Sequence, residues 1–192
     1  WPALKKHKAF KLSAIADPAF DTKAKRLALS RKVQVVTNYQ DLAFSAIDAA
    51  IIATPNAYHY PIAQDLLSRG IPVLVEKPVT LQADHYQHLI QKQTPPAVLK
   101  SGMVKRHSKI GILLKNCFRE QVLGKLKHFD LQAGTVFNWP VQGPGFFDRA
   151  KSGGGVLMDN GIHTLDLLFW WLQAEAGLPS VKNLGYYDDA CG

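Results

Sequence analysis

The first two thirds of the chain alternate between short apolar runs and longer stretches in which apolar residues recur at helical spacing. Runs rich in β-branched residues predict strands over residues 10–16, 33–36, 48–54, 72–76 and 97–104. Apolar positions three or four apart predict helices over residues 21–30, 59–69 and 81–93. The strand over 48–54 (DAAIIAT) is apolar at consecutive positions, which predicts burial on both faces, as in a parallel sheet.

Strands that alternate with helices at this spacing predict an α/β fold with a parallel sheet and right-handed crossovers. In such sheets, ligands bind at the carboxyl ends of the strands. The first candidates for a functional site are therefore the residues that follow three of the strands, namely Asp17, Thr54-Pro55-Asn56 and Glu76-Lys77-Pro78.

The pattern changes after about residue 104. A helix is predicted over 108–122, and an extended run with alternating apolar positions covers 125–138. A loop rich in glycine and proline (140–155), a helix (156–172) and a last strand (181–187) follow. We therefore expect two domains, an α/β domain over 1–103 and part of an α+β domain over 104–192.

Composition places the chain among globular proteins. Of its 192 residues, 47% are hydrophobic and 20% are charged, which is too apolar for intrinsic disorder. The richest apolar stretch, 156–172, is interrupted by polar and charged residues and does not reach the roughly 18 apolar residues of a membrane span. Cys117 and Cys191 lie far apart and form no spaced framework, and no signal peptide is visible. We expect a cytoplasmic protein with no membrane partner.

The net charge of +8 is concentrated at the start of the chain. Residues 1–32 hold nine Lys and Arg but only Asp17 and Asp21 as acidic residues. A basic cluster can bind nucleic acid, but these residues are spaced like the solvated faces of two amphipathic segments. We favour the solvated faces and predict no nucleic-acid partner.

The candidates at the strand ends each have a functional and a structural interpretation. Asp17 could accept hydrogen bonds from an adenosine ribose and repel a 2′-phosphate, or it could simply begin a turn. Thr54 and Asn56 could reach a ribose or phosphate, or Asn56 could cap a helix that begins at a surface His59. Lys77 could hold a hydroxyl or a nicotinamide amide, or it could be an exposed lysine.

A second group of polar residues follows Gly153-Gly154-Gly155. Asp159 and His163 are four positions apart, which predicts that they share one face of the helix over 156–172. A histidine beside a carboxylate can act as a general base. The pair could also bind a metal, but the spacing suggests no third ligand, so we predict no metal site.

These motifs together resemble a known family. The run DAAIIATPNAYHYPIAQDLLSRGIPVLVEKPVTL (48–81) and the later GGGVLMDNGIHTLDLLFWWL (153–172) are similar to the glucose–fructose oxidoreductase / inositol dehydrogenase / MocA family. The resemblance implies an NAD-binding (or NADP-binding) Rossmann domain joined to an α+β domain with an open, mainly antiparallel sheet. It implies hydride transfer at a hydroxyl-bearing carbon of a sugar, a cyclitol or a related compound. The alternative is a non-catalytic sugar- or nucleotide-binding remnant of the same fold.

The resemblance also implies roles for individual residues. Lys77 matches the active-site lysine, before a cis peptide to Pro78, and Asp159 and His163 match the substrate-binding carboxylate and the proton-transferring histidine. The positions that match substrate-binding residues are Lys77, Arg106, Asp159 and His163. The positions that match the cofactor lining are Asp17, Thr54, Pro55, Asn56, His59, Glu76, Lys77 and Pro78.

The chain departs from the family pattern at both ends. The family opens with a strand and a G-x-G-x-x-G turn, and neither is present; its C-terminal sheet is also cut short. We therefore expect an internal portion of a longer enzyme, which forms homo-oligomers through that sheet when intact. Without the central first strand, the strands over 10–16 and 48–54 lose the neighbour between them. The 192-residue chain alone is expected to bind NAD poorly and to associate through those edges.

Overall fold

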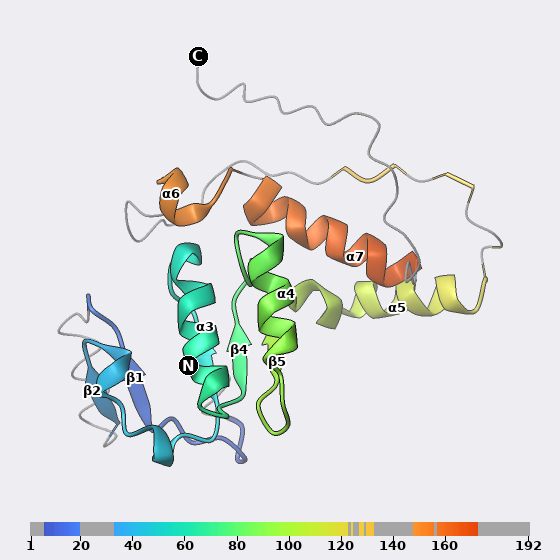
Figure 1. Ribbon diagram of the computed structural model, residues 1–192. Helices are drawn as coiled ribbons and strands as arrows, with labels where there is room; N and C mark the ends of the chain where they lie inside the picture. Colours follow the sequence, from blue (N-terminus) through green and yellow to red (C-terminus); the bar gives the residue numbers. More distant parts are fainter. Residues whose placement is uncertain are drawn as a thin grey trace.

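The structure is a computed structural model that describes residues 6–19, 33–122, 124, 127–128, 130–132, 148–155 and 157–172. Its described strands form two parallel sheets (Figure 1). In one sheet, β1 (Ala14–Ala16) pairs with β2 (Gln34–Val36). In the other, β4 (Val73–Val75) lies between β3 (Ala50–Ile52) and β5 (Leu99–Ser101). The predicted parallel α/β fold is confirmed.

Each of these strands falls inside a predicted one and is shorter than it. The backbone hydrogen bonds continue one residue past the strands, as when Asp17 N donates to Val36 O at 3.0 Å and Glu76 N donates to Ile52 O at 2.9 Å. Beyond those bonds the chain turns away, so the polar residues after β1, β3 and β4 lie in loops at the carboxyl edge. This is the edge at which a ligand is expected.

The core lies between the three-stranded sheet and the helices α3 (His59–Ser68) and α4 (Ala83–Gln91). Its buried members are Ile52, Ala63, Leu66, Leu67, Ile71, Val73, Val75, Val79, Leu89 and Ala97. Burying a large aliphatic side chain of this kind contributes about 1.5–3 kcal/mol to the free energy of unfolding. These packing contacts hold in place the carboxyl edge of the three-stranded sheet, where the loops after β3 and β4 begin.

The other face of this sheet is exposed. Ile51 and Leu74 point away from α3 and α4 because side chains alternate along a strand, and they are 55% and 39% exposed. The prediction that the strand over 48–54 is buried on both faces is therefore correct for Ile52 and wrong for Ile51. Helices α3 and α4 both pack on the same face of this sheet. An apolar run in the sequence does not show whether one face of its strand is covered or both.

The two sheets are separate. β1 and β3 are not hydrogen-bonded to each other in the described part of the chain. That the strands over 10–16 and 48–54 lack a common neighbour stays a prediction.

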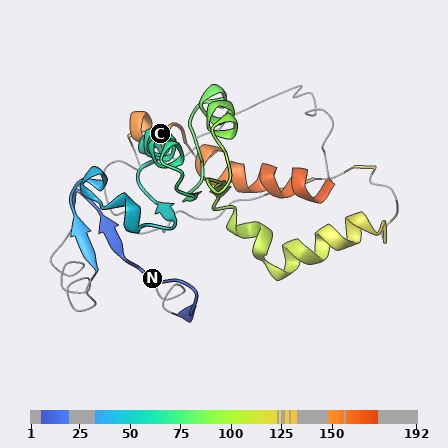
Figure 2. The same ribbon diagram turned by 60° about the horizontal axis from the view of Figure 1, so that its bottom comes forward.

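The second half of the described chain is helical. It contains α5 (Lys109–Arg119), α6 (Arg149–Ser152), the π-helical turn η6 (Leu157–Gly161) and α7 (Ile162–Leu172). Helices α5 and α7 lie side by side, and Trp171 Nε1 donates to Gly111 O at 3.0 Å (Figures 1 and 2). Short 3-10 turns also occur, namely η1 (Tyr39–Asp41), η2 (Phe44–Ala46), η3 (Asn56–Tyr58) and η4 (Val104–His107).

Several predicted elements cannot be compared with the structure. The helix over 21–30 and the strand over 181–187 lie outside the described residues, as does most of the extended run over 125–138. The described residues contain no antiparallel sheet of the kind expected there. Within the same ranges, no helix has both the length and the apolar character needed to cross a bilayer.

Candidate functional site

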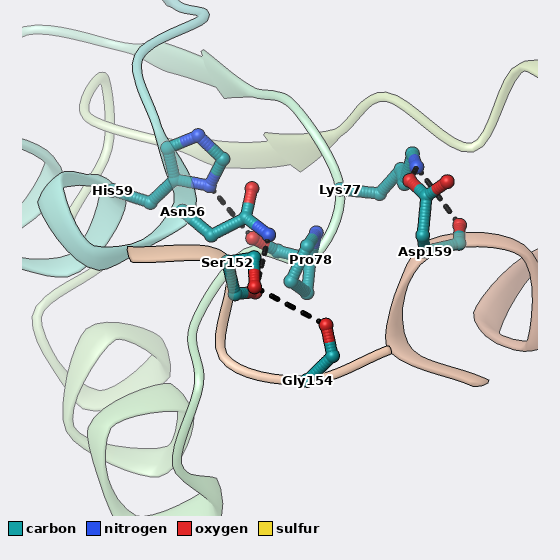
Figure 3. Close-up of polar contacts among 7 residues, drawn as sticks. All are labelled: Asn56, His59, Lys77, Pro78, Ser152, Gly154 and Asp159. Carbon is teal, nitrogen blue, oxygen red and sulfur yellow. Dashed lines mark hydrogen bonds and ion pairs between the residues drawn. The ribbon is translucent and has the colours of Figure 1, made fainter. Parts of the chain in front are cut away.

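The site lies where the loop after β4 meets the turn before α7 (Figure 3). Lys77 Nζ donates to the backbone oxygen of Asp159 at 2.8 Å and also pairs with the carboxylate Oδ1 of the same residue. The Lys77 side chain is 21% exposed, so the alternative of an ordinary exposed lysine is wrong. The Lys77–Pro78 peptide is cis, as the resemblance implied.

Asp159 does not lie in a regular α-helix. The predicted helix over 156–172 begins as the π-helical η6, and only from Ile162 does it continue as α7. In a π-helix the backbone hydrogen bonds join residue i to i+5 rather than to i+4. The shared face of Asp159 and His163 stays a prediction. The described contacts of the Asp159 carboxylate and backbone oxygen are with Lys77.

His163 is a buried histidine beside this pair. The residue is 7% exposed, and Nδ1 has no hydrogen-bond partner among the described residues. Burial lowers the pKa of His163 below its ordinary value, and the positive charges of Lys77 and Lys105 lower it further. Asp166 and Asp159 oppose this shift without cancelling it. A lowered pKa favours the uncharged ring, which is the form that can accept a proton.

His59 is buried rather than at the surface, so the surface-histidine alternative is wrong. Its Nδ1 lies 2.7 Å from the carbonyl oxygen of Pro78, and its Nε2 lies 2.8 Å from that of Thr54. Both ring nitrogens are thus occupied by backbone. The hydroxyl Oγ1 of Thr54 is buried without a hydrogen-bond partner in the described structure.

Asn56 joins the β3 loop to the glycine-rich segment. Its Nδ2 donates to Ser152 O at 2.7 Å, and Ser152 Oγ donates to Gly154 O at 3.2 Å (Figure 3). The alternative that Asn56 caps the following helix is wrong, because Tyr58 is the N-cap of α3 and makes no side-chain capping bond. The contact brings residues 96 positions apart in sequence to the same edge.

The remaining cofactor candidates lie at the strand ends. Asp17 is exposed after β1, and its Oδ1 accepts from Ala19 N at 2.8 Å, so it does form a turn. Pro55 is exposed, and Glu76 is exposed after β4, with its carboxylate against Gly102. Pro78 is buried. The turn of Asp17 leaves its side chain at the surface, where it remains available to a ligand.

Arg106 is held by Asp166 rather than pointing freely at the site. Its Nε donates to Asp166 Oδ2 at 2.8 Å and its Nη2 donates to Oδ1 at 2.5 Å, which is a bidentate ion pair. Asp166 received no role from the sequence, although its position three residues after His163 on one helix was a usable signal. The positive charge of Lys105 lowers the pKa of His163, but no spacing in the sequence pointed to this contact.

A hollow of about 880 Å³ lies beside the site, between α4, α5 and α7. Its lining includes Pro78, Tyr86, Arg106, Ile162, Asp166 and Trp170. The described residues contain no group of three or more His, Cys, Asp or Glu that could hold a metal ion. Lys77, Asp159 and His163 together offer a hydrogen-bond donor, a carboxylate acceptor and an imidazole at one place.

Comparison with known proteins matches both halves of the chain. Residues 1–94 match the family described as "Oxidoreductase family, NAD-binding Rossmann fold", and residues 112–178 match the "GFO/IDH/MocA C-terminal domain". Both matches agree with the resemblance seen in the sequence.

Curated relatives match over most of this chain. A protein of Amycolatopsis mediterranei described as a UDP-kanosamine synthase oxidoreductase subunit is 32% identical over 179 residues, covering 91% of this chain and 48% of the relative. UDP-N-acetylglucosamine 3-dehydrogenase of Acidithiobacillus ferrooxidans is 30% identical, with coverages of 87% and 50%. Inositol 2-dehydrogenase 4 of Saccharopolyspora erythraea is 25% identical, with coverages of 90% and 49%. The chain spans about half the length of these relatives.

Solved structures share the fold. An NAD-binding protein from Listeria innocua superposes with a TM-score of 0.72 at 21% identity, covering 88% of this chain and 49% of that one. GenD2 from gentamicin A biosynthesis, in complex with NAD, superposes with a TM-score of 0.70 at 23% identity, covering 89% and 49%. At these identities the likeness shows the fold alone.

Proposed function

Because the chain belongs to the Gfo/Idh/MocA family of oxidoreductases, with an NAD-binding Rossmann fold, we propose that it transfers a hydride between NAD and a hydroxyl-bearing carbon of a sugar, cyclitol or sugar derivative. The observation that carries this proposal is the contact of Lys77 with Asp159 beside the buried His163. These residues come from two distant segments and meet at the edge where a parallel sheet binds its ligand.

The charge of each side chain determines its role in the proposed reaction. NAD, when bound, supplies the hydride acceptor. Neutral His163 takes the proton of the substrate hydroxyl, and its buried ring excludes water from that transfer. Lys77 donates to a substrate oxygen, and Asp159 accepts from a neighbouring hydroxyl while orienting the lysine.

The described residues fit an NAD ligand at the strand ends. Thr54 Oγ1 is a buried hydroxyl without a partner in the described structure, and a ribose hydroxyl or an amide would satisfy it. Asp17 is an exposed carboxylate after β1, suited to ribose hydroxyls and unfavourable to a 2′-phosphate. We therefore assign NAD as the preferred cofactor, with NADP as the alternative. Pro55, Asn56, Glu76 and Pro78 shape the same edge.

Arg106 takes a different role from the one that the resemblance implied. Both of its described hydrogen bonds are with Asp166, and its guanidinium carbon lies 5.8 Å from the centre of the Trp170 ring on the same helix. We therefore assign Arg106 to holding α7 rather than to binding substrate. His59 likewise has no free ring nitrogen for a cofactor.

The names of the relatives support the substrate class. They include inositol and UDP-N-acetylglucosamine dehydrogenases, so both a cyclitol and a nucleotide sugar are reasonable first substrates. The alternative, a non-catalytic remnant of the fold, has no observation in its favour at this site. The domain boundary at 103/104, the antiparallel sheet, the homo-oligomer and the cytoplasmic location stay predictions.

The test is turnover by the protein in its natural full length. The protein is mixed with NAD and a panel that includes myo-inositol and UDP-N-acetylglucosamine, and NADH absorbance is followed. We expect NADH from at least one hydroxyl compound, a loss of about 100-fold in kcat for His163→Gln, and wild-type turnover for the matched control His88→Gln. NAD binding without turnover across a broad panel of sugars and cyclitols would favour the remnant instead.

A further inference from the structure

His59 lies between the two loops that carry the site, although it touches neither Lys77 nor Asp159 by its hydrogen bonds. It starts α3 and is fully buried, and Figure 3 shows its ring directed at Pro78. One ring nitrogen contacts the residue directly after Lys77. The other contacts Thr54, whose hydroxyl has no hydrogen-bond partner among the residues that the structure describes.

The two contacts join loops that no described strand-to-strand hydrogen bond connects. The loop after β3 carries Thr54 and Asn56, and the loop after β4 carries Lys77 and Pro78. The ladder between β3 and β4 ends where Glu76 N donates to Ile52 O. Past that point the ring of His59 is the described polar link between these two loops.

We propose that His59 is a positioning residue that fixes Lys77 through the Pro78 carbonyl and the cofactor loop through the Thr54 carbonyl. Its meaning for catalysis rests on the proposed function, but the positioning itself does not. A carbonyl oxygen only accepts, so each contact is made through an N–H on the ring nitrogen that faces it. Either contact can therefore be removed by choosing which donor to keep.

Two amide side chains separate the two contacts. Nδ1 of histidine is two bonds from Cβ, as is the amide nitrogen of asparagine, whereas Nε2 is three bonds away, as is the amide nitrogen of glutamine. His59→Asn therefore keeps the donor toward Pro78 and loses the one toward Thr54. His59→Gln keeps the donor toward Thr54 and loses the one toward Pro78.

The test measures how freely Lys77 reacts. The natural full-length protein and its variants are treated briefly with acetic anhydride, and the acetylation rate of each lysine is measured by peptide mass spectrometry. Lys115 is the internal reference, because its Nζ donates to Trp170 O at 3.1 Å, away from His59. His88→Gln, which removes a histidine bonded to Tyr60 instead, is the control variant.

We expect Lys77 to react about 5-fold faster in His59→Gln, the factor that corresponds to one ordinary hydrogen bond. It should react at the wild-type rate in His59→Asn and His88→Gln, and Lys115 should not change in any variant. The dissociation constant for NAD should rise about 5-fold in His59→Asn and stay near wild type in His59→Gln.

Three results overturn the proposal: an unchanged Lys77 rate in folded His59→Gln, equal acceleration in both His59 variants, or Lys77 and Lys115 accelerating together, which is general loosening. Should His59→Gln not fold by circular dichroism, the His59→Asn variant decides, since accelerated Lys77 there contradicts the proposal and a wild-type rate supports it. The labelling needs no substrate or NAD. A parent protein that does not bind NAD therefore counts against the proposed function, while the labelling still decides the role of His59.

Discussion

Lys77 and Asp159 are 82 positions apart in sequence, yet Lys77 Nζ donates to the backbone oxygen of Asp159 at 2.8 Å as well as to its carboxylate. The two contacts fix the direction in which the Lys77 amine points, in addition to balancing its charge. It joins the carboxyl edge of the three-stranded sheet to the turn that leads into α7.

Removing either partner should abolish most turnover with little loss of fold. We expect Lys77→Met and Asp159→Asn to lower kcat by about 100-fold or more, because both would misplace the substrate hydroxyl. The matched control is Lys151→Met, which removes a more exposed lysine that is 3.5 Å from Asp148. Steady-state kinetics with a thermal unfolding curve for each variant make the comparison. Near-normal kcat for Lys77→Met would remove Lys77 from the chemistry.

The charge of Lys105 should set the pH at which the enzyme loses activity in acid. Burial, Lys77 and Lys105 lower the pKa of His163, so the neutral base persists at a pH below the ordinary histidine value. Lys105→Gln removes one of these positive charges and raises the pKa of His163. The acid limb of kcat/KM should therefore move to higher pH.

The control for this shift is Lys109→Gln, an exposed lysine on α5 that is not among the groups acting on His163. Its acid limb should coincide with that of the wild type. An acid limb that moves to lower pH in Lys105→Gln contradicts the assignment of His163 as the base.

Asp17 should decide the choice of cofactor. Its exposed carboxylate follows β1, where it repels the 2′-phosphate of NADP. We expect the wild type to prefer NAD, and Asp17→Ser to lower the ratio of kcat/KM for NAD to that for NADP by about 10-fold or more. Kinetics with both cofactors measure this ratio, and Asp41→Ser is a control at another exposed carboxylate. A wild-type preference for NADP would show that Asp17 does not face the ribose.

Arg106 and Asp166 should couple in stability rather than in substrate binding. Their bidentate pair ties η4 to α7, with Asp166 the more buried partner. A double-mutant cycle of Arg106→Gln and Asp166→Asn, read by the free energy of unfolding, should give a coupling of about 1–2 kcal/mol. The KM for substrate should change little in Arg106→Gln. A large rise in KM with zero coupling would return Arg106 to the substrate site.

The local elements were predictable because each is determined by nearby residues. The period of two or of 3.6 located the strands and helices, and proline and glycine marked their ends, as after Ala16 and at Gly70. The exposure of Ile51 was not predictable, because an apolar run does not show whether a second layer covers the sheet. The π-helical turn at Asp159 was also missed, because its pattern of apolar residues continues that of α7.

The site depended on contacts that no spacing encodes. The family resemblance placed Lys77 and Asp159 in one site. Neither the strand pattern before Lys77 nor the helical spacing around Asp159 predicted an ion pair between them. For His59 the sequence offered a place in the cofactor lining or a surface position, and it predicted neither of the observed ring contacts. Its partners are backbone oxygens of two loops, and such atoms leave no signature in the side chains.

The most direct test of the central claim is the transfer of deuterium from substrate to cofactor. The natural full-length protein is given oxidised NAD and a sugar or cyclitol deuterated at its hydroxyl-bearing carbons, and the NADH is analysed by mass spectrometry. The account predicts NADH that carries one deuterium, formed about 100-fold more slowly by His163→Gln and at the wild-type rate by His88→Gln. NADH without deuterium, or equal rates for the His163 variant and the wild type, would contradict it.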